Sequence, residues 1–238
     1  MDMFTWTKDS INWYKQAAEY TKYDQEIYQE IEPFIEETDT VCDIACGLGF
    51  ISMQLAKKAK SVTAIDISAQ ALQLLQKNIE RQSITNMEVI TSDIADLPAK
   101  PQWDVTVMSF FKQSDDAMLQ LLDMSKKRAI LVLSNGSKTN FWPNNSRPSK
   151  QGNADRLIQE LKAKGVRINS IERDLDFGQP FHSFDEAIQF MKHYAPNNLP
   201  ENLEDHLRVH LVPMEENPFG YRYYLPHIKK IVIVIADK

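Results

Sequence analysis

The sequence predicts an α/β fold in which a doubly wound, mostly parallel sheet is covered by helices on both faces. Strand-like and helix-like segments alternate five times between residues 40 and 133. The strand-like segments are continuous apolar runs, which is typical of strands buried on both faces. Right-handed crossovers then place a ligand site at the carboxyl ends of the strands, where the strand order reverses.

Residues 1–39 are expected to form a helical N-terminal segment. Apolar or aromatic residues recur there mostly every three or four positions, which is the helical period. Asp9 and Ser10 offer a helix N-cap, and Pro33 ends the second helical piece. The segment either packs on the sheet or lies over the mouth of a nucleotide site. The residues that set the period are Ile11, Tyr14, Ala18, Ile27, Ile31 and Phe34.

The first strand, expected at residues 41–45, runs into a glycine turn and then into a helix at residues 50–59. Gly47 and Gly49 permit backbone angles, and a close approach of a ligand, that a side chain would block. The helix points its free N–H groups back into the turn. Strand, turn and helix together form half of a nucleotide-binding βαβ unit.

Polar side chains also stand where the next three strands end. Asp66 ends the second strand, Asp93 follows the third, and Ser109 lies near the end of the fourth. Because the carboxyl ends of parallel strands meet at one edge of the sheet, we expect these residues beside the glycine turn. A carboxylate at the tip of the second strand is placed to accept hydrogen bonds from both ribose hydroxyls. The strands are expected at residues 61–66, 87–91, 103–110 and 129–133, with helices at residues 69–82 and 114–124.

The composition changes after the fifth strand, and residues 134–153 are expected to form a long polar loop of the kind that is often functional. Residues 176–230 separate the sixth strand from the last one. We expect this insertion to fold as a partly helical cap over the carboxyl edge of the sheet, within a single domain of residues 1–238. The remaining elements are expected at residues 154–164 (helix), 167–175 (strand), 184–194 and 201–212 (helices of the cap) and 231–235 (strand).

Composition restricts the class of protein. The hydrophobic content of 43% is enough for a sizeable core, and the net charge is −6, from 27 basic and 33 acidic residues. Basic residues form only short runs at expected helix ends, which disfavours a nucleic-acid substrate. The N-terminus lacks the pattern of a signal peptide, no apolar run has membrane-spanning length, and two cysteines four positions apart do not make a disulfide framework. These features predict a soluble cytoplasmic protein with no membrane partner.

Two kinds of nucleotide fit a glycine turn after a buried strand. The dinucleotide fingerprint Gly-x-Gly-x-x-Gly requires a third glycine, where this chain has Ser52. A dinucleotide fold also has no need of an acid at the end of its first strand, where Asp43 stands. We expect Asp43 to meet a cationic ligand, and one with an ammonium group and a sulfonium centre would suit it.

Residues 43–49, Asp-Ile-Ala-Cys-Gly-Leu-Gly, resemble the first motif of class I S-adenosylmethionine-dependent methyltransferases. Asp66 matches the ribose-binding acid of that family, and Asp93 with Ile94 matches its adenine-contacting position. Trp13, Ala17 and Tyr20 resemble a pattern of some members in which an N-terminal helix covers the methionine end of the cofactor.

The resemblance covers residues 10–135 and implies a Rossmann-like sheet of seven strands, the last antiparallel and set between the fifth and the sixth. It implies in-line transfer of the sulfonium methyl group to a nucleophile, with the enzyme contributing mainly positioning and desolvation. Ala45 departs from the glycine that many members carry. The implied cofactor contacts are Tyr20, Asp43, Ala45, Cys46, Gly47, Gly49, Asp66, Ile67, Asp93, Ile94 and Ser109.

The methyl acceptor is expected to be a small molecule. Residues 109–112 read Ser-Phe-Phe-Lys, and not the Asn-Pro-Pro-aromatic signature of amino-directed nucleic-acid methyltransferases. His182 follows a turn-forming Gly-Gln-Pro and is the first candidate for a general base. The aromatic residues of the loop and the cap either line a substrate pocket or form the core of the cap. They are Phe141, Trp142, Phe181, Phe184, Tyr221, Tyr223 and Tyr224.

Two alternatives stand beside this interpretation. One is a protein that binds S-adenosylmethionine without transferase activity and uses the cap for regulation or for a partner. The other is an NAD-dependent oxidoreductase, which would give saturable changes in NADH fluorescence. Cys46 is expected to be a small packing residue, and with Cys42 it does not form a metal site. The oligomeric state is left open.

Overall fold

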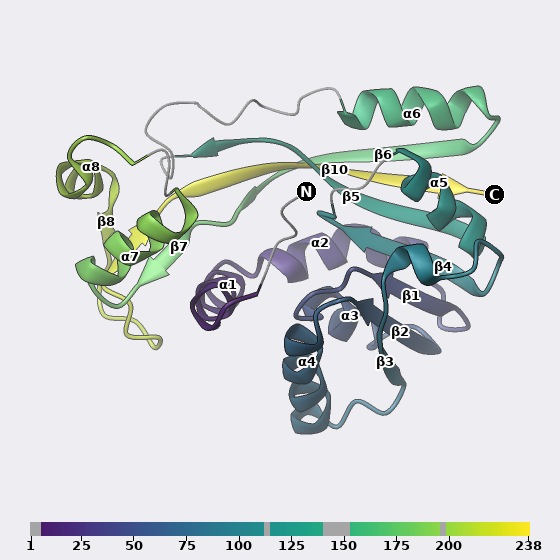
Figure 1. Cartoon of the computed structure of the whole chain (residues 1–238), viewed down its shortest axis with the longest axis horizontal. Coiled ribbons are helices and arrows are strands. Elements are labelled where there is room, and N and C mark those ends of the chain that lie inside the picture. The colour runs from purple at the N-terminus through teal and green to yellow at the C-terminus, as the bar shows by residue number, and fades with distance from the viewer. Residues whose placement is uncertain (1–5, 112–114, 140–152, 196–198) are drawn as a thin grey trace.

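The computed structural model describes residues 6–111, 115–139, 153–195 and 199–238, and contains a seven-stranded sheet in the order β3-β2-β1-β4-β5-β10-β6 (Figure 1). The last strand, β10, is antiparallel to both neighbours, β5 and β6, whereas the pairs among β1 to β5 are parallel. This order confirms the prediction of a doubly wound sheet with its last strand between the fifth and the sixth. The strands are β1 (Thr40–Ile44), β2 (Ser61–Asp66), β3 (Met87–Thr91), β4 (Trp103–Ser109), β5 (Ser125–Thr139), β6 (Arg167–Asp176) and β10 (His227–Asp237).

Helices cover both faces of this sheet, because successive side chains of a strand point to opposite faces. In β10, Ile231 and Ile233 pack with α2 and α3, whereas Val232 and Val234 pack with α5 and α6. Such double burial explains why the strands are continuous apolar runs in the sequence. The helices are α1 (Lys8–Thr21), α2 (Tyr23–Ile31), α3 (Phe50–Leu55), α4 (Ala69–Gln82), α5 (Asp115–Met124) and α6 (Asn153–Ala163), with 3₁₀ turns at Glu32–Phe34 and Ile94–Asp96.

The N-terminal segment forms two helices, in agreement with the two helical pieces expected from the sequence. Thr7, and not the expected Asp9 or Ser10, is the N-cap of α1, and its hydroxyl accepts a hydrogen bond from the backbone N–H of Ser10. Lys22 then adopts a left-handed conformation with φ of 61°, which ends α1 and starts α2 in a new direction. As a result α2 lies on the sheet, whereas α1 lies beside its edge (Figure 1).

The insertion between β6 and β10 contains strands as well as helices. It holds helices α7 (Phe184–Tyr194) and α8 (Leu203–His210), and also a small sheet that the sequence did not predict, in the order β7-β9-β8. Trp13 of α1 joins the core of the insertion, beside Phe190. Figure 1 shows the insertion beyond one end of the long strands β5 and β10, next to α1. The small strands are β7 (Gln179–Phe181), β8 (Val212–Pro213) and β9 (Tyr223–Leu225).

The long strands β5 and β10 correct two expected boundaries. Residues 134–139, expected to belong to a long loop, are part of β5, which continues to Thr139. The last strand begins at His227 instead of residue 231, and His227 pairs with Thr139. Polar residues extend here as strands because each strand satisfies the backbone groups of the other. Phe141 and Trp142, expected either to line a substrate pocket or to belong to the core of the cap, lie outside the described residues.

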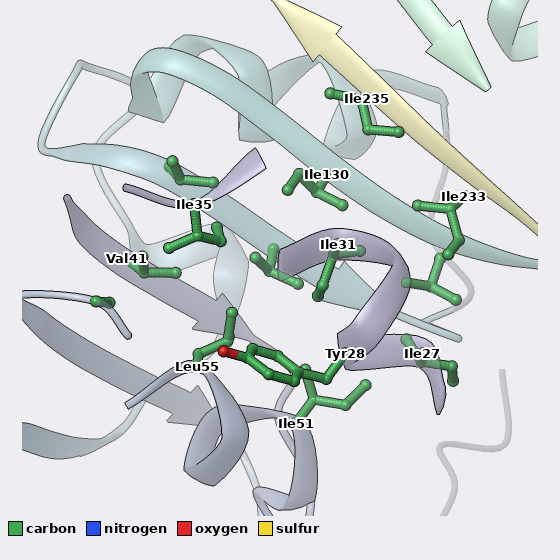
Figure 2. Close-up of a cluster of buried hydrophobic side chains, with 14 of the residues drawn as sticks. Ile27, Tyr28, Ile31, Ile35, Val41, Ile51, Leu55, Ile130, Ile233 and Ile235 are labelled. Carbon is green, nitrogen blue, oxygen red and sulfur yellow. The ribbon is translucent and has the colours of Figure 1, made fainter. Parts of the chain in front are cut away.

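The core beneath α2 gives the first test. Ile31 is fully buried among strand and helix side chains (Figure 2). We expect Ile31→Ala to lower the free energy of unfolding by about 2–5 kcal/mol, because the truncation leaves a cavity in a close-packed core. Val209→Ala, at a side chain 78% exposed on α8, should change it by less than about 0.5 kcal/mol. Urea unfolding followed by circular dichroism measures both, and equal losses would contradict this account of the core.

Candidate functional site

A cavity of about 540 Å³ lies at the carboxyl edge of the sheet, beside the ends of β1, β2 and β4. Its volume is within the range of pockets that hold a small-molecule ligand. The cavity brings together ten of the eleven residues that the sequence predicts as cofactor contacts. They are Asp43, Ala45, Cys46, Gly47, Gly49, Asp66, Ile67, Asp93, Ile94 and Ser109.

The turn after β1 is a tight, left-handed piece of backbone. Ala45, Gly47 and Gly49 have φ angles of 57°, 55° and 71°. The backbone N–H of Gly49 donates to the carbonyl of Cys46 at 2.9 Å, and Gly49 is the N-cap of α3. A Cβ atom on Gly49 would lie 2.4 Å from Cδ1 of Leu75, so glycine is required there by space as well as by conformation.

The carboxylate of Asp66 fixes this turn to the second strand. Its Oδ2 accepts a hydrogen bond of 2.8 Å from the backbone N–H of Gly47, and its Oδ1 accepts one of 2.8 Å from the N–H of Ser68. Each carboxylate oxygen can accept more than one hydrogen bond. Asp66 therefore holds the turn and still presents acceptor capacity to the cavity that it lines.

Asp43 gives the cavity a buried acid at the base of the turn. It is 2% exposed, and its Oδ2 accepts a hydrogen bond of 2.5 Å from Oγ of Ser52. The pKa of Asp43 is raised to about 7, mainly by burial and to a smaller extent by the charges of Asp66 and Asp24, against the lowering effect of the hydrogen bond from Ser52. Three carboxylates thus share one region, so the site favours a ligand with positive charge.

Asp93 and Ser109, the other two polar residues at the strand ends, differ in their hydrogen bonding. Oδ1 of Asp93 accepts a hydrogen bond of 2.9 Å from the N–H of Ala95 and so caps the short 3₁₀ turn that follows. Oγ of Ser109 is buried and, within the described part of the chain, has no hydrogen-bond partner. A buried hydroxyl without a partner points to a group that a ligand would supply.

Several residues of the cavity were not predicted from the sequence. Trp6 lies over Gly47, and Tyr14 packs edge-on against Trp6 with ring centroids 5.6 Å apart. The hydroxyl of Tyr14 donates to Oδ1 of Asp24 at 2.9 Å, and Lys229 of β10 lines the same cavity. Asp24 could have been identified from the sequence, because it is an acid at a position where the helical spacing of apolar residues in α2 predicts burial. For Lys229 we found no such signal, because the sequence around it does not show which of the two adjacent lysines, Lys229 or Lys230, belongs to the cavity.

Two predicted residues lie away from the cavity. Tyr20 packs instead against the insertion, with ring centroids 5.3 Å from Tyr224 and 6.0 Å from Tyr221. Nδ1 of His182 lies 3.2 Å from the carbonyl oxygen of Gly220, and its ring packs on Tyr221. Neither side chain borders the cavity, so the geometry gives no support to a cofactor contact for Tyr20 or to a base role for His182.

Comparison with known proteins assigns the family. A family model described as a methyltransferase domain matches residues 35–182. The chain belongs to the class I S-adenosylmethionine-dependent methyltransferases. A probable cobalt-precorrin-6B C(15)-methyltransferase of Methanococcus maripaludis is 32% identical over 153 residues, covering 63% of this chain and 74% of that protein. A probable ribosomal RNA small subunit methyltransferase A of Methanosphaera stadtmanae is 30% identical over 99 residues, covering 41% of this chain and only 36% of that protein.

Solved structures share the fold of this methyltransferase. The YcgJ protein of Bacillus subtilis superposes with a TM-score of 0.60 at 12% identity, covering 91% of this chain and 98% of that one. A magnesium protoporphyrin IX methyltransferase of Synechocystis, solved with bound S-adenosylhomocysteine, gives a TM-score of 0.56 at 13% identity, covering 100% and 90%. Among the described residues, no helix is both long and apolar enough to span a bilayer, and no three His, Cys, Asp or Glu side chains are grouped to hold a metal ion.

Ala45 provides a test of strain in the turn of this methyltransferase. We expect Ala45→Gly to raise the free energy of unfolding by up to about 1 kcal/mol, because a left-handed φ disfavours a side chain but not glycine. Ala56→Gly, at a right-handed φ of −63° after α3, should lower it by about 0.5–1 kcal/mol. Thermal and urea unfolding measure both. A loss of stability in Ala45→Gly equal to that in Ala56→Gly would contradict strain at position 45.

The raised pKa of Asp43 gives a second test. The pKa of Asp43 is about 7 in the folded protein and 3.8 ordinarily, so the folded state keeps its proton between these two values while the unfolded state loses it. The wild-type protein therefore becomes less stable as the pH rises from about 4 to 7. We expect the unfolding free energy of Asp43→Asn, relative to wild type, to increase from pH 4 to 7 by at most about 1.4 kcal/mol per pH unit. Urea unfolding at each pH measures it. Glu88→Gln, on an exposed side chain of β3, should show no such trend, and parallel curves for Asp43→Asn and wild type would refute the prediction.

Proposed function

We propose that this chain transfers the methyl group of S-adenosylmethionine to a small-molecule acceptor held in the same cavity. The observation that carries the proposal is the meeting of the glycine turn with Asp43, Asp66 and Asp93 around one cavity of about 540 Å³. Such a set combines a close approach of backbone to ligand with carboxylates at the positions that a nucleoside and a cation need.

The cofactor is proposed to lie across the ends of the first three strands. In this arrangement the ribose hydroxyls donate to Asp66, and the adenine lies between Ile67 and Ile94. The N–H of Ala95 already satisfies one oxygen of Asp93, which leaves the other oxygen for a donor from the base. The amino-acid end then extends over the turn towards Asp43. All of these side chains line the cavity, which supports this orientation.

The acceptor is proposed to enter on the side of Phe111, which follows β4 and lines the cavity together with Trp6. Aromatic walls favour a planar or apolar small molecule. The net charge of −6 disfavours a polyanionic partner. Relatives named for acceptors of both kinds, an RNA and a precorrin, match this chain, so the proposal depends on these features of the chain itself.

The bound cofactor supplies the electrophilic methyl group, and the residues of the chain orient the reactants and exclude water. Asp66 and the turn hold the nucleoside, and this fixes the position of the sulfur relative to the acceptor. Trp6 and Tyr14 cover the turn. Their removal of water strengthens the electrostatic interactions inside the cavity. We further propose that residues 176–230 act as a cap on one domain and adjust how the acceptor enters.

Binding of S-adenosylhomocysteine tests the cofactor site. We expect saturable binding by calorimetry, and we expect Asp66→Ala to weaken it by about 1–3 kcal/mol through loss of the ribose contacts and of the bond to Gly47. Glu88→Ala, an exposed carboxylate on the neighbouring strand, is the control and should bind as wild type does. If wild type binds neither S-adenosylhomocysteine nor S-adenosylmethionine, the proposed function is wrong.

The acceptor is tested by incubating the protein with methyl-labelled S-adenosylmethionine and a cell extract divided into small-molecule, RNA and protein fractions. Label that enters the small-molecule fraction with wild type, but not with Asp66→Ala, supports the proposal. Label in the RNA fraction would overturn the assignment of the acceptor. Binding without transfer to any fraction would favour the alternative of a cofactor-binding protein that has no transferase activity.

A further inference from the structure

Two charged residues at one end of the cavity belong to none of the motifs that resemble the family. Asp24 lies in the first turn of α2, and Lys229 lies on β10, more than two hundred positions later in the chain. Both line the same cavity as the glycine turn. A buried carboxylate without full hydrogen bonding is costly for a fold to maintain, and a half-buried ammonium without an acidic partner adds to that cost, so their presence here needs a reason beyond packing.

Asp24 is only partly satisfied by the protein. It is 6% exposed, and its Oδ1 accepts a hydrogen bond of 2.9 Å from the hydroxyl of Tyr14. Its Oδ2 has no hydrogen-bond partner among the described residues. Burial raises the pKa of Asp24 to about 6, against the lowering effects of Tyr14 and Lys229. The free oxygen is therefore an acceptor site that a donor from a ligand would complete.

Lys229 is held by aromatic rings and not by a carboxylate. Its Nζ lies 3.5 Å from the ring centroid of Phe110, 5.2 Å from that of Tyr23 and 5.4 Å from that of Phe177. Within the described part of the chain, no acidic group forms an ion pair with this ammonium. Burial lowers the pKa of Lys229 to about 8, while the more distant charge of Asp24 acts in the opposite direction.

The two charges are thus close enough to influence each other but are not paired. A ligand that carries an ammonium and a carboxylate on one carbon atom would satisfy both at once. Asp24 bonds to Tyr14, whose ring packs against Trp6 over Gly47, so Asp24 lies at the end of the cavity near the turn, whereas Asp93 and Ile94 lie on the side of β3. With the ribose at Asp66, an amino-acid group attached to the sugar would extend towards Asp24.

We propose that Asp24 and Lys229 form a specificity site for the amino-acid head of the cofactor, with Oδ2 of Asp24 accepting from the α-ammonium and Nζ of Lys229 donating to the α-carboxylate. The inference rests on the proposed function and adds to it. The pair makes this chain select the intact methionine head over nucleosides that lack it. Tyr14 is a positioning residue, because its hydroxyl orients the Asp24 carboxylate.

The test compares two ligands by calorimetry. S-adenosylhomocysteine carries the amino-acid head, and 5′-methylthioadenosine has the same nucleoside and sulfur without it. We expect Asp24→Asn and Lys229→Met each to weaken binding of S-adenosylhomocysteine by roughly 10- to 100-fold, as for loss of a hydrogen bond between charged groups, and to leave binding of 5′-methylthioadenosine unchanged. Asp66→Ala should weaken both ligands, because both carry the ribose.

Matched controls separate this effect from general changes of charge. Glu26→Gln removes an exposed carboxylate from the same turn of α2, and Lys230→Met removes the neighbouring ammonium, which points to the opposite face of β10. Both should bind the two ligands as wild type does. Circular dichroism confirms that each variant is folded, and retained binding of 5′-methylthioadenosine is a second check.

The outcomes distinguish this inference from the proposed function. If wild type binds neither ligand, the proposed function fails. If wild type binds both ligands but Asp24→Asn and Lys229→Met keep full affinity for S-adenosylhomocysteine, the cofactor site stands and the specificity site is wrong. Equal loss for both ligands would also overturn it, because the residues would then act on the shape of the whole cavity and not on the amino-acid head.

Discussion

The carboxylate of Asp66 is the interaction on which the geometry of the site depends. Its two hydrogen bonds of 2.8 Å join the turn after β1 to the end of β2 and to the start of α4. Ala45, Gly47 and Gly49 all have left-handed φ angles, which an isolated chain would rarely adopt together. The backbone can remain in this shape because Asp66 bonds to the middle of it. The remaining walls of the cavity are built around that fixed edge.

Buried carboxylates lie close together at the same edge of the sheet. Asp43 and Asp24 are almost fully buried, and burial raises the pKa of each to about 7 and about 6. The site therefore contains groups that are destabilising when ionised, as is common in a binding site whose shape is formed before the ligand binds. The ionised carboxylates repel one another, and a cationic ligand would reduce this repulsion. The site therefore prefers ligands with positive charge.

The sequence predicted those parts of the fold and site that depend on local pattern. Buried strands appear as apolar runs, and the turn with Asp43 and Asp66 lies within one βαβ unit. Lys229 was missed because β10, the last strand of the sheet in the sequence, returns between β5 and β6 and brings a distant residue to the cavity. Asp24 was missed because the helical period marks a position as buried but does not say which cavity it borders. Tyr20, expected at the cofactor from a resemblance in the sequence, packs against the insertion, because such a resemblance does not say which neighbour a helix face meets. The small sheet was missed because its strands have only two or three residues.

Helix α1 connects the cavity with the insertion through consecutive side chains. Tyr14 points to the cavity, where it bonds to Asp24, while Trp13 packs with Phe190 in the core of the insertion. Gln16, one turn later than Trp13, donates to Glu186 of α7 at 3.1 Å. A displacement of α1 would therefore move Tyr14 and the insertion together. It follows that changes in the insertion can alter how Asp24 is held without any contact between the insertion and the cofactor.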